Sequence, residues 1–301
     1  MRTMSKIGLE TGQLTDEEIK YIDTAVVQTV EPLLIGRQIF PRATLPDAGF
    51  KTVQFYTETD MSAATISMLG ETGARDRLEL TAVPVNVPVI SKDFIIHWRD
   101  VIAARHRGEP LDTAHIRNAA RQVAEEEDKL LITGEYSGWK ACGVKGLVTV
   151  ANNLGTSASG KWDVASVIIA DVKAAVAALS AVGHYGPYAM ICTPSQYQCL
   201  KIPVGTGAEV SVYTWIMRDL FDNKGQIFQT PSLYAAAGTT DSALVVEPGA
   251  GNFDVAIGQD TTTYLFQDED MNILGKVYEV LTPRIKRPAA IYEISSIDET
   301  T

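Results

Sequence analysis

The sequence has few of the residues that most often build catalytic and metal centres. Its 301 residues include three cysteines and four histidines. Cys142, Cys192 and Cys199 form no C-x-x-C pair and leave one thiol over, so buried, reduced thiols in a cytoplasmic protein are the simplest interpretation. A Cys192–Cys199 link stays open on spacing alone.

Long apolar runs and an excess of positive charge are also missing. No apolar run approaches the length of a membrane span, and the first 18 residues lack the apolar stretch of a signal peptide. The net charge of −11 argues against a surface that neutralises phosphates. We therefore expect neither a membrane nor a nucleic-acid partner, and the apolar content of 46% predicts a globular chain with a sizeable core.

Catalytic motifs are missing as well. The chain contains no G-x-S-x-G, Walker A or G-x-G-x-x-G motif. His97, His106 and His115 are spaced nine residues apart, which steps them around a helix instead of gathering them on one face. Asp112 and His115 make a single Asp-x-x-His pair, which is a weak signal. The sequence therefore predicts no enzyme, no metal site and no catalytic residue.

The stretch AEEEDKLLITG, residues 124–134, is the one dense acidic cluster. It ends a predicted helix of about 20 residues, which Gly134 stops. Glu125, Glu126 and Asp128 fall off the apolar stripe of this helix and are expected in solvent, whereas Glu127 lies on it and needs a cation or a backbone donor. A carboxylate di-metal site would require Glu-x-x-His motifs, which the chain lacks, so this helix is predicted to be structural.

The rest of the chain predicts an α+β protein in three parts. Residues 40–80 are predicted to form an extended arm with a strand at 51–56 and little core of its own. Such an arm is expected to pack on a neighbouring copy, and a disordered loop is the alternative. Residues 135–224 are predicted to form an α/β lobe. A helix is expected over 93–107, and two strands are expected to form a hairpin through the turn Pro248–Asn252.

Several sequence blocks together resemble encapsulin shell proteins, in the family's order and spacing over about residues 16–294. They are LLIGRQIFP, VPVISKDFIIHWRDVIAARHRGEPLD, AEEEDKLLITGEYSGWKACGVKGLV, GHYGPYAMI, ALVVEPGAGNFDVAIGQD and PRIKRPAAIYEI. The resemblance implies the phage major capsid fold of the Hong Kong 97 type. The implied parts are an N-terminal helix with the start of the P-domain (1–45), the E-loop (46–81), the P-domain with its spine helix (82–134), the A-domain (135–225) and C-terminal strands shared by P-domain and A-domain (226–301).

The resemblance also implies a function. Encapsulins self-assemble into icosahedral nanocompartments in the cytoplasm and enclose cargo enzymes, such as ferritin-like iron-storage proteins or peroxidases, that dock through a targeting peptide. Some relatives bind flavin at a tryptophan, but the matching position here is Asp100, with Trp98 nearby, so no cofactor is expected. The alternative is the major capsid protein of a tailed phage or prophage that packages DNA, which the acidic balance does not favour.

Two sites follow from the resemblance. The loop of Gly183, His184, Tyr185 and Gly186 would line a pore for small ions at the five-fold axis, where the imidazoles would form a ring that titrates near neutral pH.

The second implied site is a groove for the cargo peptide. Val30, Leu34, Arg37 and Thr263 would build it, with apolar side chains for the aliphatic anchors of the peptide. Arg37 would hold a carboxyl or carbonyl group of the peptide. Alternatively, Val30 and Leu34 are ordinary core residues.

Overall fold

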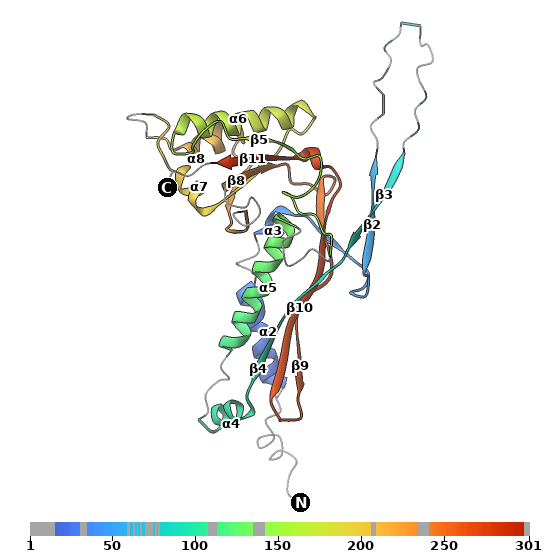
Figure 1. Ribbon diagram of the computed structural model, residues 1–301, viewed down its shortest axis with the longest axis vertical. Coiled ribbons are helices and arrows are strands. Elements are labelled where there is room, and N and C mark those ends of the chain that lie inside the picture. Colours follow the sequence, from blue (N-terminus) through green and yellow to red (C-terminus); the bar gives the residue numbers. More distant parts are fainter. Residues whose placement is uncertain are drawn as a thin grey trace, which may run out of the picture.

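The computed structural model is an α+β chain in three parts, which we call the body, the arm and the lobe (Figure 1). It describes residues 16–30, 35–58, 61–62, 64, 66, 68–69, 75, 77, 79–107, 113–134, 142–205, 209–233 and 241–297. In this part of the chain, no helix combines the length and the apolar character that a membrane span requires.

The body is a four-stranded sheet with two helices packed on it. The strand order is β1–β9–β10–β4, and β9 and β10 form a long antiparallel ribbon. Helix α5 packs on β4 and β10, while α2 packs on α5 and β9. The elements are α2 (Asp16–Val30), α3 (Gly36–Ile39), β1 (Arg42–Thr44), β4 (Val89–Ile96), α4 (Trp98–Arg107), α5 (Ala114–Ile132), β9 (Phe253–Gln267) and β10 (Ile273–Ile285).

The lobe is a five-stranded sheet of order β5–β11–β8–β6–β7, covered by α6. Its central strand, β8, pairs antiparallel with β6 on one side and with β11 on the other, so three segments separated in the sequence lie side by side. The elements are β5 (Leu154–Ser157), α6 (Ala165–Ala181), β6 (Ala189–Cys192), α7 (Pro194–Cys199), α8 (Val212–Trp215), a π-helical turn (Ile216–Leu220), β7 (Gln226–Gln229), β8 (Asp241–Val246), a 3-10 turn (Pro288–Ala290) and β11 (Ile291–Ile297).

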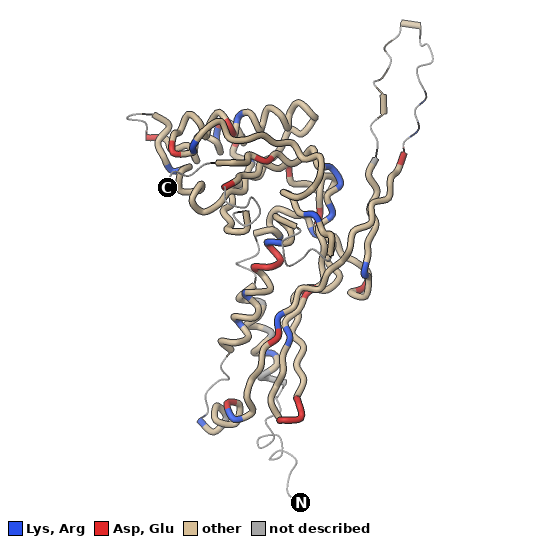
Figure 2. Tube along the Cα trace, in the orientation of Figure 1, with Lys and Arg blue, Asp and Glu red and all other residues tan. Residues whose placement is uncertain are grey.

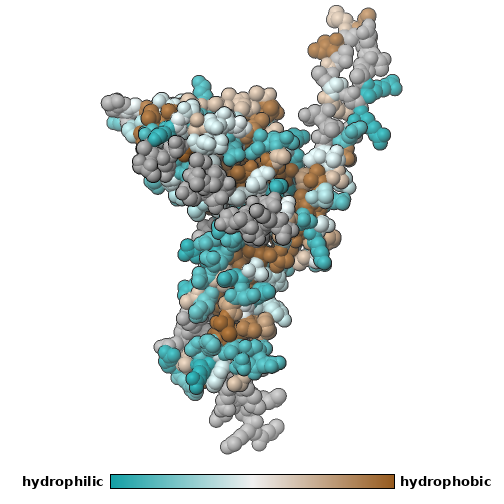
Figure 3. Space-filling view, in the orientation of Figure 1, coloured by the Kyte–Doolittle hydropathy of each residue, from teal (hydrophilic) through white to brown (hydrophobic). Residues whose placement is uncertain are grey.

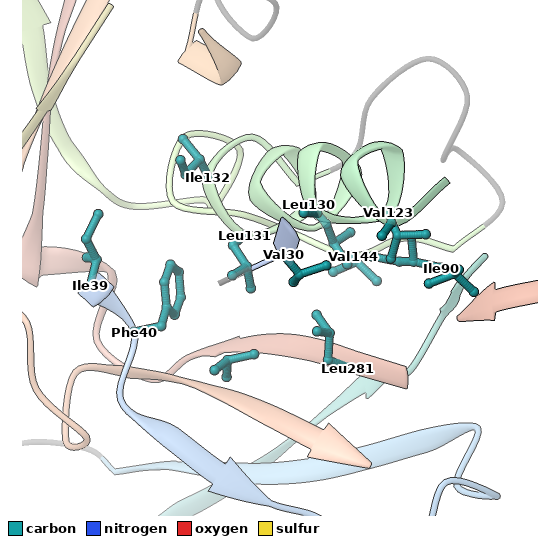
Figure 4. Packing of buried hydrophobic residues seen from close by; sticks show 14 of the residues in the cluster. Val30, Ile39, Phe40, Ile90, Val123, Leu130, Leu131, Ile132, Val144 and Leu281 are labelled. Atoms are coloured by element: carbon teal, nitrogen blue, oxygen red, sulfur yellow. The ribbon is translucent and has the colours of Figure 1, made fainter. Parts of the chain in front are cut away.

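The lobe sheet is buried on both faces, which explains the continuous apolar runs of β6 and β8. Successive side chains of a strand point to opposite faces of the sheet. Met190 and Cys192 therefore join the core beneath α6, whereas Ala189 and Ile191 join the core of the body. Figure 4 shows part of the body core, where residues of α5 such as Leu131 lie near Phe40 and Leu281.

Helix α5 ends where the sequence predicts, and the reason is a close backbone contact. Gly134 has a φ of +76°, and a Cβ added there would lie 2.0 Å from the amide nitrogen of Gly146. A Cβ on Gly146 would lie 2.3 Å from the amide nitrogen of Gly134. Both positions require glycine because the segment after the helix returns alongside its last turn, where the Val148 amide donates to the Ile132 carbonyl.

The arm is an antiparallel hairpin of β2 (Thr52–Glu58) and β3 (Leu80–Asn86), so the predicted strand near 51–56 is confirmed. Its root packs on the ribbon through Leu45 and Val87, which contact Ala256 and Val280 in a small cluster. Beyond the root the arm extends away from the body and lobe, and hydrophobic atoms lie at its far end (Figure 3). The large apolar residues exposed there are Met61 (61%), Ile66 (99%), Met68 (104%) and Leu69 (86%).

Two predictions of local structure are wrong. Helix α4 begins only at Trp98, because the residues up to Ile96 pair along β10 as strand β4. The turn at Pro248–Asn252 does not close a hairpin. The strands that it joins, β8 and β9, belong to different sheets, since β8 pairs with β6 and β11 while β9 pairs with β1 and β10.

Candidate functional site

Charged residues of both signs converge where α3, α5, β9 and β10 meet. Figure 2 shows blue and red segments close together at the end of α5 that faces the lobe. We call this group the charge cluster; it consists of Arg37, Glu127, Asp128, Asp260 and Glu279.

Arg37 is the centre of the cluster and is almost fully enclosed. Its side chain is 5% exposed, and its Nε and Nη2 donate to the two carboxylate oxygens of Glu127 at 2.6 and 3.0 Å. Nη1 donates to Asp260 at 2.5 Å, and Nη2 also reaches Glu279 at 3.2 Å. The prediction that Glu127 finds a cation is therefore confirmed, and every guanidinium nitrogen of Arg37 already has a protein acceptor.

Glu279 stands at an irregularity of the β9–β10 ribbon. The register shifts between Tyr278 and Val280, so that Asp260 and Thr261 of β9 face Glu279 alone, which is a β-bulge. Glu279 is fully buried; its Oε2 accepts from the Thr261 hydroxyl at 2.9 Å, and its Oε1 has no hydrogen-bond donor among the described residues. Burial and the neighbouring Glu127 carboxylate raise the pKa of Glu279 to about 9.

Asp128 corrects a sequence prediction. It was expected in solvent but is 5% exposed, and its carboxylate accepts from the amides of Gly36 at 2.8 Å and Ile35 at 3.3 Å. Burial raises its pKa to about 7 despite these two bonds. The helical pattern of α5 failed here because α3 packs over that side of the helix, a contact that periodicity does not report.

The remaining acids of the stretch behave as surface residues. Glu125 accepts from Arg121 one turn earlier, and Glu126 accepts from Lys129. Within the described ranges no group of three His, Cys, Asp or Glu residues could hold a metal ion. The one guanidinium of the charge cluster binds carboxylates from α5, β9 and β10, so the cluster ties these elements to α3.

The three cysteines are free thiols in the structure. Cys192 lies inside the lobe sheet, where burial raises the pKa of its thiol to about 12. A protonated, enclosed thiol is a weak nucleophile and a poor metal ligand.

The loop from Gly183 to Gly186 follows α6 at one end of the lobe. Gly183 and Gly186 have φ values of +89° and +93°, a backbone that favours glycine. Between them, Tyr185 is 78% exposed, whereas His184 is only 7% exposed. Within one chain the phenol thus reaches solvent and the imidazole points inward.

His184 is held by Glu247, a residue that the sequence reasoning missed. The His184 Nδ1 lies 2.5 Å from Glu247 Oε2, the Gly186 amide donates to Glu247 Oε1 at 2.8 Å, and Asn252 Nδ2 donates to Oε2 at 3.0 Å. Burial would raise the pKa of Glu247, but these hydrogen bonds hold it below its ordinary value. Its only sequence signal is a single acid at the end of the apolar run ALVVEPG.

The predicted groove residues are spread over the body. Val30, the last residue of α2, is 4% exposed within the body core, and Thr263 lies half-buried on β9. Arg37 belongs to the charge cluster, and Leu34 lies outside the described residues. Helix α2 packs against β9, so Val30 and Thr263 come from adjacent elements.

Similar proteins are known. Residues 4–282 match the family described as "Encapsulating protein for peroxidase". The type 1 encapsulin shell protein EncA of Myxococcus xanthus (strain DK1622) is 29% identical, over 98% of each chain. A diheme-cytochrome-encapsulin shell fusion protein of Kuenenia stuttgartiensis is 27% identical over 95% of this chain and 75% of its own length.

Solved structures show the same fold. A virus-like particle from Pyrococcus furiosus has a TM-score of 0.65 at 15% identity, covering 92% of this chain and 99% of its own. The capsid of Myoviridae phage XM1 has a TM-score of 0.64 at 12% identity, covering 82% and 86%. The predicted capsid fold is confirmed, and the family match favours the encapsulin prediction over the phage alternative. The chain belongs to the encapsulin family, whose model is described as an encapsulating protein for peroxidase.

Proposed function

We propose that this protein forms the wall of a closed icosahedral compartment in the cytoplasm that encloses a cargo enzyme. The observation that carries the proposal is the family match over residues 4–282, whose description names the encapsulation of a peroxidase. The relatives from Myxococcus xanthus and Kuenenia stuttgartiensis are both named as shell proteins. A ferritin-like iron-storage protein or a peroxidase is the expected cargo, and the shell itself is structural instead of catalytic.

The arm supports assembly on physical grounds. Its far end exposes Ile66, Met68 and Leu69, and isolated chains seldom leave such residues in water together. Among the described residues, no further strand pairs with the two-stranded hairpin β2–β3, which leaves both of its edges able to pair with another strand. We propose that neighbouring copies cover the arm, and that body, arm and lobe correspond to the P-domain, E-loop and A-domain with the ranges given above.

We propose two sites in the shell. The loop Gly183–Gly186 would border a pore at the five-fold axis, with Tyr185 as the side chain that faces passing ions and His184 as its inner support. The cargo peptide would bind beside α2 and β9, near Val30, Leu34 and Thr263. The guanidinium of Arg37 already binds three carboxylates of the chain. Arg37 would therefore support the groove from beneath instead of binding the peptide directly.

Electron microscopy of the purified protein, with mass spectrometry of what co-purifies, tests the proposal. Hollow particles that contain a ferritin-like or peroxidase protein are expected. Particles filled with DNA would favour a phage capsid, and a stable, folded single chain at high concentration would refute the shell. For the groove, Leu34→Asp shells should lose binding of a fluorescent targeting peptide that wild-type shells retain.

A further inference from the structure

The charge cluster contains more acid than its cation can neutralise. Arg37 donates to Glu127, Asp260 and Glu279. If all three were ionised, a single guanidinium would face three carboxylates, two of them with fully buried side chains. Uncompensated buried charge is strongly unfavourable, so one of these groups is expected to take up a proton.

The geometry identifies which carboxyl takes it. Asp260 is 58% exposed and can remain ionised in water. Glu127 receives two guanidinium hydrogen bonds, at 2.6 and 3.0 Å, which favour its charged form. Glu279 receives a single, longer one at 3.2 Å, and its buried Oε1 receives none from a described donor. Glu127 Oε2 and Glu279 Oε2 accept from the same nitrogen, Arg37 Nη2, so the two carboxyl groups meet at one donor and Glu127 is the acceptor nearest to a proton on Glu279.

We propose that Glu279 holds a proton at neutral pH and shares it with Glu127, which makes the charge cluster a proton-dependent brace between α5 and the bulge of β9. With the proton in place, α5, β9 and β10 are tied together through one satisfied network. Loss of the proton places two buried carboxylates side by side and weakens the attachment of the bulge to the helix. The inference concerns the folded chain itself and holds whether or not the shell forms as proposed.

The surroundings of Glu279 favour its protonated form on balance. The pKa of Glu279 is raised first by burial and then by Glu127, and the cation Arg37 only partly offsets both. The pKa of Asp260, the most exposed acid of the charge cluster, lies below its ordinary value because the positive charges of Arg37 and Arg42 outweigh the effect of its partial burial. The groups around the site are Arg37 from α3, Arg42 from β1, Glu127 and Asp128 from α5, and Asp260 from β9.

The sign of the pH effect follows from linkage. The ordinary pKa of 4.5 applies to Glu279 in the unfolded chain, and the folded value is about 9. Between these values the folded state binds the extra proton, so stability falls as pH rises through this window. Because the folded state binds one proton more than the unfolded state, each unit increase in pH inside the window raises the unfolding equilibrium constant about tenfold.

The test uses the full-length protein and its Glu279→Gln variant, in which an amide of the same size donates permanently to Glu127. Infrared spectroscopy at neutral pH should show the carbonyl stretch of a protonated carboxylic acid in the wild type and a weaker band in the variant, because Asp128, whose pKa is about 7, adds to the same band. The free energy of unfolding should be measured with guanidinium between about pH 5 and 9. Its slope against pH should correspond to one proton fewer in the variant than in the wild type. The Asp128→Asn variant shows how much Asp128 contributes to the band and to the pH dependence. Glu125→Gln, on the exposed side of α5, is the matched control and should change neither.

Two results would overturn the proposal. The first is a wild-type spectrum without a protonated-acid band at neutral pH, which decides the question even if Glu279→Gln fails to fold. The second is a folded Glu279→Gln protein that keeps the band at full intensity and the full pH dependence of the wild type.

Discussion

Replacement of Arg37 by methionine should be one of the most damaging single changes in the body. Methionine fills much of the same volume but leaves Glu127 and Glu279, both fully buried, without their cation. Removing one partner of a buried ion pair costs about 3–5 kcal/mol. That loss is a large fraction of the stability of a typical domain, which is about 5–15 kcal/mol.

The loss should depend on pH in a direction that the structure fixes. Without the guanidinium, the pKa of Glu127 in the folded state rises further above its ordinary 4.5, because burial is then opposed by fewer favourable contacts. A carboxyl whose folded pKa is raised contributes stability that is lost as pH increases above the unfolded value. We therefore expect a small loss near pH 4, where the carboxyls are protonated in both states, and the full loss at neutral pH.

Guanidinium unfolding of the full chain, followed by tryptophan fluorescence at the two pH values, measures this difference. Arg121→Met is the matched control on the exposed side of α5, where Arg121 is 62% exposed and pairs with Glu125. Exposed pairs of this kind contribute at most about 0.5 kcal/mol. The reasoning fails if Arg37→Met loses no more stability than Arg121→Met, or if its loss is the same at both pH values.

Three further predictions concern other parts of the molecule. Gly146→Ala places a Cβ 2.3 Å from a backbone nitrogen and should cost about 3 kcal/mol, seen as a lower thermal midpoint or a loss of folded protein. Ile66→Ser with Met68→Ser should leave the circular dichroism unchanged but reduce the yield of particles in size-exclusion chromatography; equal yields would contradict the proposed role of the arm. Glu247→Gln weakens the hydrogen bonds that hold the His184 loop and should cost about 1–3 kcal/mol at neutral pH, measured as faster hydrogen exchange of that loop. Because the folded pKa of Glu247 is lowered, its contribution should fade only below about pH 4.5, and an effect that survives at lower pH would count against it.

The sequence predicted local elements well because their signals are local. The spine helix, its stop at Gly134 and the β-run of the arm depend on periodicity and on a glycine that the chain itself carries. The need of Glu127 for a cation also followed from its place on the apolar stripe. What periodicity could not supply was the identity of that cation, since Arg37 lies 90 residues away along the chain.

The errors share one cause, which is packing between elements distant in sequence. Asp128 lies off the apolar stripe of α5, yet α3 covers it and supplies two amides. The turn at Pro248–Asn252 resembles a hairpin in sequence, but its flanking strands complete two separate sheets. His184 lies in a glycine-rich loop that reads as exposed, and only the return of the chain at Glu247 turns the imidazole inward.

The chain crosses between lobe and body twice in its last quarter, and Asn252 joins the two crossings. β8 leaves the lobe sheet at Val246 to begin β9 in the body, and β10 returns to the lobe as β11. The Asn252 carbonyl accepts from the amides of Lys286 at 2.8 Å and Arg287 at 2.9 Å, while its side chain donates to Glu247. Within the described ranges, the angle between lobe and body is thus fixed by two short connections bonded to each other, in addition to the shared core. In a closed shell this angle determines how neighbouring copies meet, so changes at residues 247–252 and 286–290 should alter particle size more than changes within the strands.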